Sequence, residues 1–266
     1  MSSLLRRIKV VKLETTEFRN QSFGGADFSR QAKPHLRAFD CEFIGCKFDE
    51  AALSDFRSWG SHFINCTFHK TNLRNAAIGG VDKGKLNHFE RVDFSQPDMR
   101  GIASGNGAFT DCLFDRTRLD KVAFGGSQFI RCTFRGILNE VTFNAHAFRG
   151  EAFPPNTMED VDFSGAELHW VDFRKLDLDT VRFPHDKDHL VLDNYVEFLK
   201  EAVFELKGAS EVGLRQLRAV LEHNLKWVGS RQIRGVLRRN DFSEFRPGAL
   251  EKFDELVVKF GRVSPV

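Results

Sequence analysis

The chain has 266 residues, of which 41% are hydrophobic and 29% are charged, and its formal net charge is only +2. This composition predicts a folded globular protein and excludes a disordered chain. The N-terminal sequence MSSLLRRIKVVKLE lacks the uninterrupted apolar stretch of a secretory signal, and no apolar run is long enough for a membrane span. We therefore expect a cytoplasmic protein without membrane contact.

Large apolar residues recur at every fifth position between Phe18 and Phe183, with slips of register before Phe89 and before Phe143. Neither an α-helix nor a flat strand has this period. The position two residues before each of them is small or β-branched, and all five cysteines fall there. A chain that buries these two positions and exposes the other three turns a corner every five residues, so four repeats close a square coil of twenty residues.

Stretches such as GADFS at 25–29 and SGAELHWVDF at 164–173 resemble the A(D/N)LXX motif of the pentapeptide-repeat family. The resemblance covers about residues 18–183 and implies a right-handed quadrilateral β-helix. Stacked coils lie about 4.8 Å apart, so we expect an all-β solenoid of about eight coils. Cysteines twenty residues apart should have parallel side chains, which is poor disulfide geometry, and we interpret all five as reduced core residues.

A helical period replaces the five-residue period after Phe183 and Pro184. The apolar pattern predicts helices over 191–206, 210–228 and 247–260, with a short helix around Ile233, Val236 and Leu237 between the last two. We expect the first helix to cover the open end of the solenoid, because an uncovered coil presents free edge amides. The predicted domains are an N-terminal cap segment (1–17), the repeat β-helix (18–185) and a small all-α C-terminal domain (186–266).

Signatures of catalysis are absent from the sequence, which has no phosphate-binding Gly loop, HExxH or GxSxG. His185 and His189 have a ligand-like spacing but no third ligand at helical spacing. We therefore predict no catalytic residue, no metal site, no cofactor and no enzymatic activity.

Outward positions of a solenoid should be polar, yet Phe39 and Trp59 both occupy an outward slot. They lie twenty residues apart and should stack on adjacent coils, between Arg19 and Gly79. Exposed aromatic pairs are common anchors of protein interfaces. The alternative is that residues 29–38 or the N-terminal segment fold over them. The candidate protein-binding residues are Phe39, Trp59 and Trp170.

Charge is unevenly distributed along the chain, since acids prevail from 140 to 180 and bases from 211 to 240. The short third helix should carry arginines on one face, a candidate basic patch for an acidic protein or nucleic acid. Successive acids near residue 170 should point from four different faces. The basic patch comprises Arg231, Arg234, Arg238 and Arg239, and the candidate acidic surface comprises Glu159, Asp160, Asp162, Glu167, Asp172, Asp177 and Asp179.

Three functions follow from these features. The favoured one is a non-enzymatic scaffold or adaptor, in which the solenoid binds one protein and the helical domain binds another partner or forms a homodimer. Loops that interrupt Phe- and Cys-rich repeats, with the terminal helix VLDNYVEFLKEAVFEL, resemble the Qnr quinolone-resistance group. That resemblance implies a bacterial antibiotic-resistance protein that binds DNA gyrase or another topoisomerase as a DNA mimic, which requires rows of carboxylates. The third is nucleic-acid contact through the basic helix.

Overall fold

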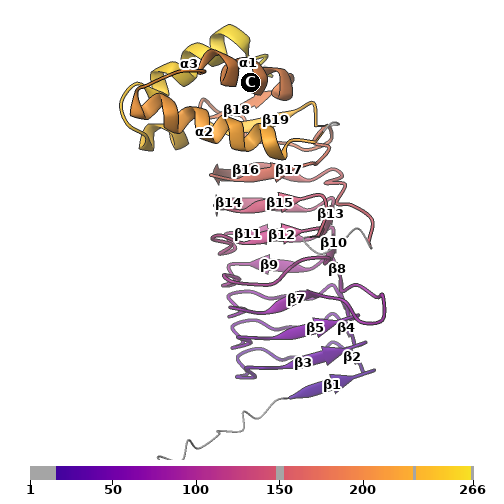
Figure 1. The fold of residues 1–266 in the computed structure, drawn as a ribbon. Coiled ribbons are helices and arrows are strands. Elements are labelled where there is room, and N and C mark those ends of the chain that lie inside the picture. Colours follow the sequence, from indigo (N-terminus) through magenta and orange to yellow (C-terminus); the bar gives the residue numbers. More distant parts are fainter. Residues whose placement is uncertain (1–15, 148–152, 230–231, 265–266) are drawn as a thin grey trace, which may run out of the picture.

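In the computed structural model, which describes residues 16–147, 153–229 and 232–264, the chain winds into a rod of stacked coils that ends in a helical domain (Figure 1). Short parallel strands of successive coils pair in columns along the rod. One side holds β1 (Glu17–Arg19), β3 (Arg37–Phe39), β5 (Arg57–Trp59) and β7 (Ala77–Gly80), and further along it β12 (Ala123–Gly125), β15 (Thr142–Asn144) and β17 (Asp172–Arg174).

The second side is the longest column, with six strands. These are β2 (Ser22–Gly24), β4 (Glu42–Ile44), β6 (His62–Ile64), β8 (His88–Glu90), β10 (Ala108–Thr110) and β13 (Gln128–Ile130). The third side holds β9 (Asp93–Ser95), β11 (Leu113–Asp115), β14 (Thr133–Asn139) and β16 (Asp162–His169). Single parallel bridges form the fourth side, through Ala32, Ala52, Asn72, Asp98 and Arg118. The predicted four-sided solenoid is therefore confirmed.

The interior of the rod is built from columns of stacked phenylalanine rings. The longest column places each ring over the corresponding ring of the coil below, with centroids 4.6 to 6.2 Å apart. It runs through Phe28, Phe48, Phe68, Phe94, Phe114, Phe134, Phe163 and Phe183. All of these rings except Phe28 are buried. Residues 29–38, which depart from the repeat in sequence, complete an ordinary coil, because Ala32 bridges to Ala52.

Some of the small residues two positions before the large apolar residues also form a hydrogen bond inside the core. The Sγ–H of Cys66 donates to the carbonyl of Phe43, and that of Cys132 donates to the carbonyl of Phe109, at 3.2 and 3.4 Å. Thr71 and Thr117 make the same bond with their hydroxyls, at 2.6 Å. All five cysteines are free thiols in the core, and burial raises the pKa of Cys66 to about 12.

Residues 81–87 connect β7 to β8 and account for the first slip of register. Asn87, at the end of this connection, is completely buried. Its Oδ1 accepts from Ser61 N–H and the Ser58 hydroxyl, and its Nδ2 donates to the carbonyls of Ser58 and Ile78, at 2.7 to 3.1 Å. The Asn87 side chain thus pairs buried polar groups that backbone groups of the next coil would pair in a regular repeat.

The C-terminal domain contains α1 (Tyr195–Glu205), α2 (Val212–Trp227) and α3 (Ala249–Phe260). The predicted short third helix is wrong. The segment is strand β19 (Gly235–Arg238) followed by a 3₁₀ turn (Arg239–Glu244), and β19 pairs antiparallel with β18 (His189–Leu192). The first helix accordingly begins at Tyr195, because the preceding apolar residues belong to β18. None of the helices in the described ranges is long and apolar enough to span a membrane.

The end of the solenoid is covered, but not by the first helix as expected. Lys175 N–H donates to the carbonyl of Trp227 at the end of α2, and the side-chain amide Nε2 of Gln232 donates to the carbonyl of Phe173. Leu168 N–H donates to Nε2 of the buried His189 at 3.0 Å. Edge groups of the last coil are therefore paired by parts of the chain that come after it. The predicted N-terminal cap segment lies almost wholly outside the described residues.

Candidate protein-binding surface

Phe39 and Trp59 stack on the outer side of neighbouring strands, as the twenty-residue spacing predicts. Their ring centroids are 4.5 Å apart and their planes differ by 5°. Strand pairing places Arg19 next to Phe39 and Phe39 next to Trp59, and the Arg19 guanidinium lies 4.0 Å from the Phe39 centroid. Both aromatic side chains are half-buried. We call Arg19, Phe39 and Trp59 the aromatic ladder.

The far face of the ladder rests on a glycine. The β5–β7 pairing contains a bulge, so Trp59 pairs with Gly80 rather than with the expected Gly79. A Cβ on Gly80 would lie 2.6 Å from Cδ1 of Trp59. Arg19 and Gly80 cover the ring faces of the ladder, so a partner reaches the rings at their edges, and the Trp59 indole N–H lies beside Gly80. That N–H has no hydrogen-bond partner among the described residues.

A fixed cluster of charges lies beside the ladder. Asp55 accepts hydrogen bonds from Arg57 at 2.6 Å and from Arg37 at 3.0 Å, and its Oδ2 lies 2.7 Å from Nδ1 of His35. Partial burial acts to raise the pKa of Asp55, but these hydrogen bonds outweigh it and lower the pKa to about 2. The cluster holds Arg37 and Arg57 on the same strands as the two aromatic residues, so cations and ring edges form one surface.

Trp170 does not form part of this surface. It contacts the C-terminal domain, since its backbone N–H donates to Asp241 at 2.8 Å and its indole Nε1–H donates to Glu244 at 3.3 Å. Its ring centroid lies 5.6 Å from that of Phe245. Trp170 therefore lies at the junction of the two domains, and its role in binding a partner stays a prediction.

The predicted acidic surface is dispersed, as the register of the repeat indicates. Asp162 and Glu167 lie near the two ends of β16, Asp172 lies on β17 in another column of strands, and Asp177 is exposed after β17. Several are neutralised by neighbours: Asp162 pairs with Arg182 at 3.0 Å, and Asp172 with Arg174 at 2.6 Å. The other members, Glu159, Asp160 and Asp179, are exposed on the same coils.

A set of carboxylates that share one side was not found from the sequence. Asp27 and Asp93 lie on one line of bridges along the third side, separated by Lys47 and Thr67. Asp49 and Asp115 lie beside that line, and His69 contacts both Asp49 and Asp93, at 3.7 and 2.9 Å. We call Asp27, Asp49, Asp93 and Asp115 the acidic face. Its members come from different coils, so no run of consecutive acids in the sequence indicates the acidic face.

The predicted basic patch does not form on one helix face, because its helix is a strand and a turn. Arg238 pairs with Asp188 at 2.8 Å and Asp241 at 3.0 Å, and Arg239 pairs with Asp254 at 2.5 Å. Arg234 pairs with Asp193 at 3.3 Å and donates to the carbonyls of the last coil. Arg231 lies outside the described residues. The three described arginines therefore pair with carboxylates of the same chain, and nucleic-acid contact through them stays a prediction.

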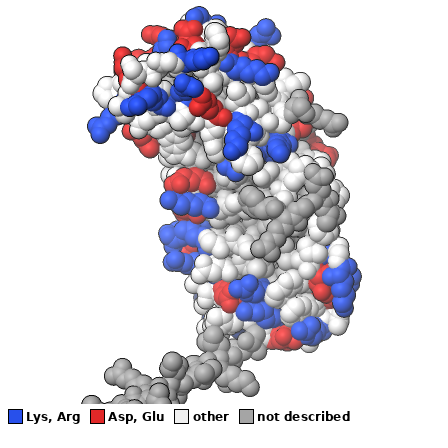
Figure 2. Space-filling view, viewed as in Figure 1, with Lys and Arg blue, Asp and Glu red and all other residues white. Residues whose placement is uncertain are grey.

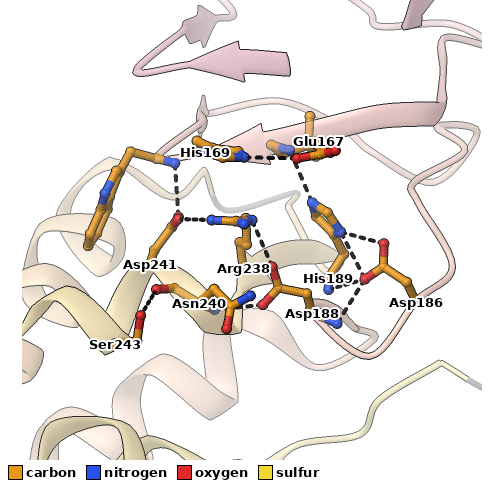
Figure 3. A network of polar contacts seen from close by, with 11 residues as sticks. Glu167, His169, Asp186, Asp188, His189, Arg238, Asn240, Asp241 and Ser243 are labelled. Carbon is orange, nitrogen blue, oxygen red and sulfur yellow. Dashed lines mark hydrogen bonds and ion pairs between the residues drawn. The ribbon is translucent and has the colours of Figure 1, made fainter. Parts of the chain in front are cut away.

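Several of these groups form the polar network that joins the solenoid to the C-terminal domain (Figure 3). Asp241, whose side chain is 7% exposed, accepts from Trp170 on the solenoid and from Arg238 on β19. Burial raises the pKa of Asp241, against the lowering effect of these two hydrogen bonds. On the other side of Arg238, the Asp188 carboxylate also accepts from Asn240 N–H. Within the described ranges, no group of three or more potential ligands has the arrangement of a metal site.

Comparison with known proteins identifies the repeat. A family model described as "Pentapeptide repeats" matches residues 41–76 and finds eight copies. A trypsin-treated form of QnrB1, a plasmid-mediated fluoroquinolone resistance protein, is similar at 15% identity over 60% of this chain and 90% of that chain, with a TM-score of 0.30. HetL, a pentapeptide-repeat protein involved in heterocyst differentiation regulation from the cyanobacterium Nostoc sp. strain PCC 7120, is similar at 20% identity over 63% and 81%, with a TM-score of 0.29. The comparison with curated proteins gave no match.

The matched repeats occupy only the first part of the rod, but their pattern extends well beyond it. The same five-residue spacing of rings that pack into the core continues on both sides of residues 41–76, from Phe23 to Phe183. The family model and the four-sided coil together identify the solenoid of this chain as one built from pentapeptide repeats.

Proposed function

We propose that this protein is a non-enzymatic, protein-binding scaffold whose solenoid contacts its partner through the aromatic ladder. The observation that carries the proposal is the stacking of Phe39 on Trp59 at an outward position of a rod whose other large aromatic residues are mostly buried. The pair is already ordered by Arg19 and Gly80, so a partner loses little side-chain freedom in binding it. Its ring edges and indole N–H, with Arg37 and Arg57 alongside, favour an acidic protein surface.

Affinity capture from the native host, followed by mass spectrometry, tests this proposal. Wild-type protein is compared with a Phe39→Ser/Trp59→Ser double variant. The matched control is Ile44→Ser/Ile64→Ser, because these residues are also outward and paired on adjacent coils, on the neighbouring side of the rod. We expect the ladder variant to lose a partner that the control retains, with thermal stability nearly unchanged. Equal capture by all three proteins would overturn the proposal.

A large fall in melting temperature of the ladder variant would identify the pair as intramolecular packing and would also end the proposal. Removal of a central aromatic anchor typically costs about 2 kcal/mol or more of binding energy. Loss of both anchors should therefore abolish capture at micromolar concentrations.

A second candidate function is binding of DNA gyrase or another topoisomerase, with protection against topoisomerase poisons. The acidic face favours it, because Asp27, Asp49, Asp93 and Asp115 lie on one side of the rod. Against it, Lys47 and His69 interrupt the row, so the face is not a continuous line of negative charge. We therefore rank this function below the scaffold.

A supercoiling assay with purified gyrase, with and without a fluoroquinolone, separates the two candidates. Inhibition or protection at low micromolar protein would favour gyrase binding. The effect should then disappear when the four acidic-face residues are changed to Asn. It should persist when Glu159→Gln and Asp177→Asn remove two exposed acids elsewhere. Absence of any effect of the wild-type protein favours the adaptor.

Self-association through the C-terminal helices is a further proposal. Phe204 on α1 and Val258 on α3 are 72% and 87% exposed, which is unusual for large apolar residues. A concentration-dependent mass in light scattering that Phe204→Ser/Val258→Ser removes would support a homodimer. A monomeric mass at all concentrations would exclude it.

A further inference from the structure

A cleft lies where the C-terminal domain meets the last coils, separate from the aromatic ladder. Its volume is about 660 Å³. One wall is the outer surface of the last two coils, with Thr142, Asp172 and Arg174, and the opposite wall is α2, with Ala219 and Asn224. Figure 1 shows α2 crossing the end of the rod and extending beyond the side of these coils. Clefts between about 300 and 1,000 Å³ are typical of sites for small molecules.

The base of the cleft is apolar. Leu168 and Val171 of the last coil, Val236 and Leu237 of β19, and Phe242 of the following turn line it. Four of these residues are buried, namely Leu168, Val236, Leu237 and Phe242. A ligand would therefore contact only the small part of the packed core that reaches the cleft. Such a base attracts an apolar body, because contact with it removes further hydrocarbon surface from water.

Charged groups around the cleft already have partners. The Asp172 carboxylate accepts from Arg174 at 2.6 Å and lies 3.3 Å from Nε2 of His223. Arg238 is held by Asp188 and Asp241. An incoming ion would have to break one of these pairs, which is unfavourable at partly buried positions. The charges therefore select against an ionic ligand rather than for one.

Two uncharged polar side chains in the lining remain available. Neither the Thr142 hydroxyl nor the Asn224 amide makes a hydrogen bond to any described residue, and they lie on opposite walls. A hydroxyl and an amide together offer donors and acceptors to a neutral polar group.

From these observations we propose that the cleft is a binding site for one uncharged small molecule with a flat or compact apolar body and one or two hydrogen-bonding groups. Its body contacts the base, and its polar groups contact Thr142 and Asn224. Because the walls belong to the solenoid and to α2, the bound molecule contacts both domains and stabilises their arrangement.

A titration with the uncharged dye Nile red tests the proposal. We expect saturable binding of one dye per chain, with quenching of tryptophan fluorescence, because Trp170 lines the cleft. Ala219→Phe and, separately, Asn224→Phe place a ring in the cleft from a helix surface and should weaken binding at least tenfold. Arg215→Phe adds the same ring to an exposed position of α2 that does not line the cleft, and should leave binding unchanged.

The alternatives to this site give different results. Dye bound to the exposed apolar residues of α1 and α3 would be lost in Phe204→Ser/Val258→Ser and retained in Ala219→Phe, which would overturn the proposal. The anionic dye 1-anilinonaphthalene-8-sulfonate should bind at least tenfold more weakly than Nile red, and equal or tighter binding would contradict the selection for an uncharged ligand. Absence of saturable Nile red binding would also overturn it. The Phe39→Ser/Trp59→Ser variant should bind the dye normally, so this site stands or falls independently of the ladder.

Discussion

Individual phenylalanines set the stability of the rod. Phe129 is completely buried, stacks on Phe109 at 5.0 Å and meets the edges of Phe124, Phe134 and Phe143. Because backbone pairing holds the coils on both sides in place, they cannot move inward to fill the cavity that a lost ring leaves. Phe129→Ala should therefore lower the free energy of unfolding by about 3 to 5 kcal/mol.

Chemical denaturation measures this loss. The control is Arg131→Ala, two residues further along, which removes an exposed ion pair with Asp111 and should cost less than about 1 kcal/mol. A loss under about 1 kcal/mol for Phe129→Ala would contradict the inward position of the ring.

Asp55 should give the protein a defined dependence on pH. Its folded pKa of about 2 is below that of an unfolded aspartate, so its contribution is fully present above about pH 4 and is lost as the pH falls through 2. Asp55→Asn should be less stable than wild type by on the order of 1 to 2 kcal/mol at pH 7. The difference should shrink between pH 4 and pH 2. A difference that stays constant over this range would show that the charge is not responsible.

At the scale of elements, the connection between β7 and β8 depends on one side chain. Asn87→Ala would leave Ser61 N–H and the carbonyls of Ser58 and Ile78 without their partner in a closed core. Since each unsatisfied buried group costs about 1 to 3 kcal/mol, we expect a loss of at least about 2 kcal/mol.

Thermal or chemical unfolding again provides the measurement for this connection. Lys85→Ala, in the same connection, removes only an exposed contact to Asp40 and should have little effect. Similar losses for both variants would show that Asn87 is not the residue that holds the loop.

The repeat was predictable from the sequence because its information is local. A buried ring at every fifth residue specifies, for each residue, the side of the rod, the coil, and whether its side chain points inward or outward. Spacing alone therefore predicted the stacking of Phe39 on Trp59 correctly. Strand β19 was not predictable, since Ile233, Val236 and Leu237 fit a helical period and its partner β18 lies far away in the chain. The acidic face was hidden for a related reason. Its carboxylates become neighbours only when different coils are superimposed. The repeat also did not predict the bulge that pairs Trp59 with Gly80 in place of Gly79.

At the scale of the whole molecule, the solenoid should respond to damage locally. Each coil contacts mainly its neighbours, so a disturbance at one end decays along the rod. His189→Ala removes the acceptor of Leu168 N–H and uncovers the last coil. We expect faster amide exchange in β16 and β17, with β3 to β6 unchanged. Hydrogen exchange with mass spectrometry measures both regions, and uniform acceleration along the rod would show that the molecule instead opens as one unit.

The charged side chains visible in Figure 2 gather near the two ends of the rod and along its edges, and the area between them in this view is mostly uncharged. The ladder lies on β1, β3 and β5 of the first coils and the cleft lies beside the last coils, so binding at the two sites involves opposite ends of the rod. Because little coupling is expected through the coils between them, the two sites should act additively rather than cooperatively.

The connections that follow β7 and β15 both begin at the same edge of the rod, between the side of β7 and β15 and the side of β8 and β13. Residues can be inserted at this edge while the stacked interior keeps its register. Lys85 from the first connection reaches Asp40, immediately after Phe39, at 2.7 Å. Related solenoids could thus acquire new partners when a loop at this edge changes its length beside an unchanged aromatic pair. Recognition would then change at one edge, and the fold would be preserved elsewhere.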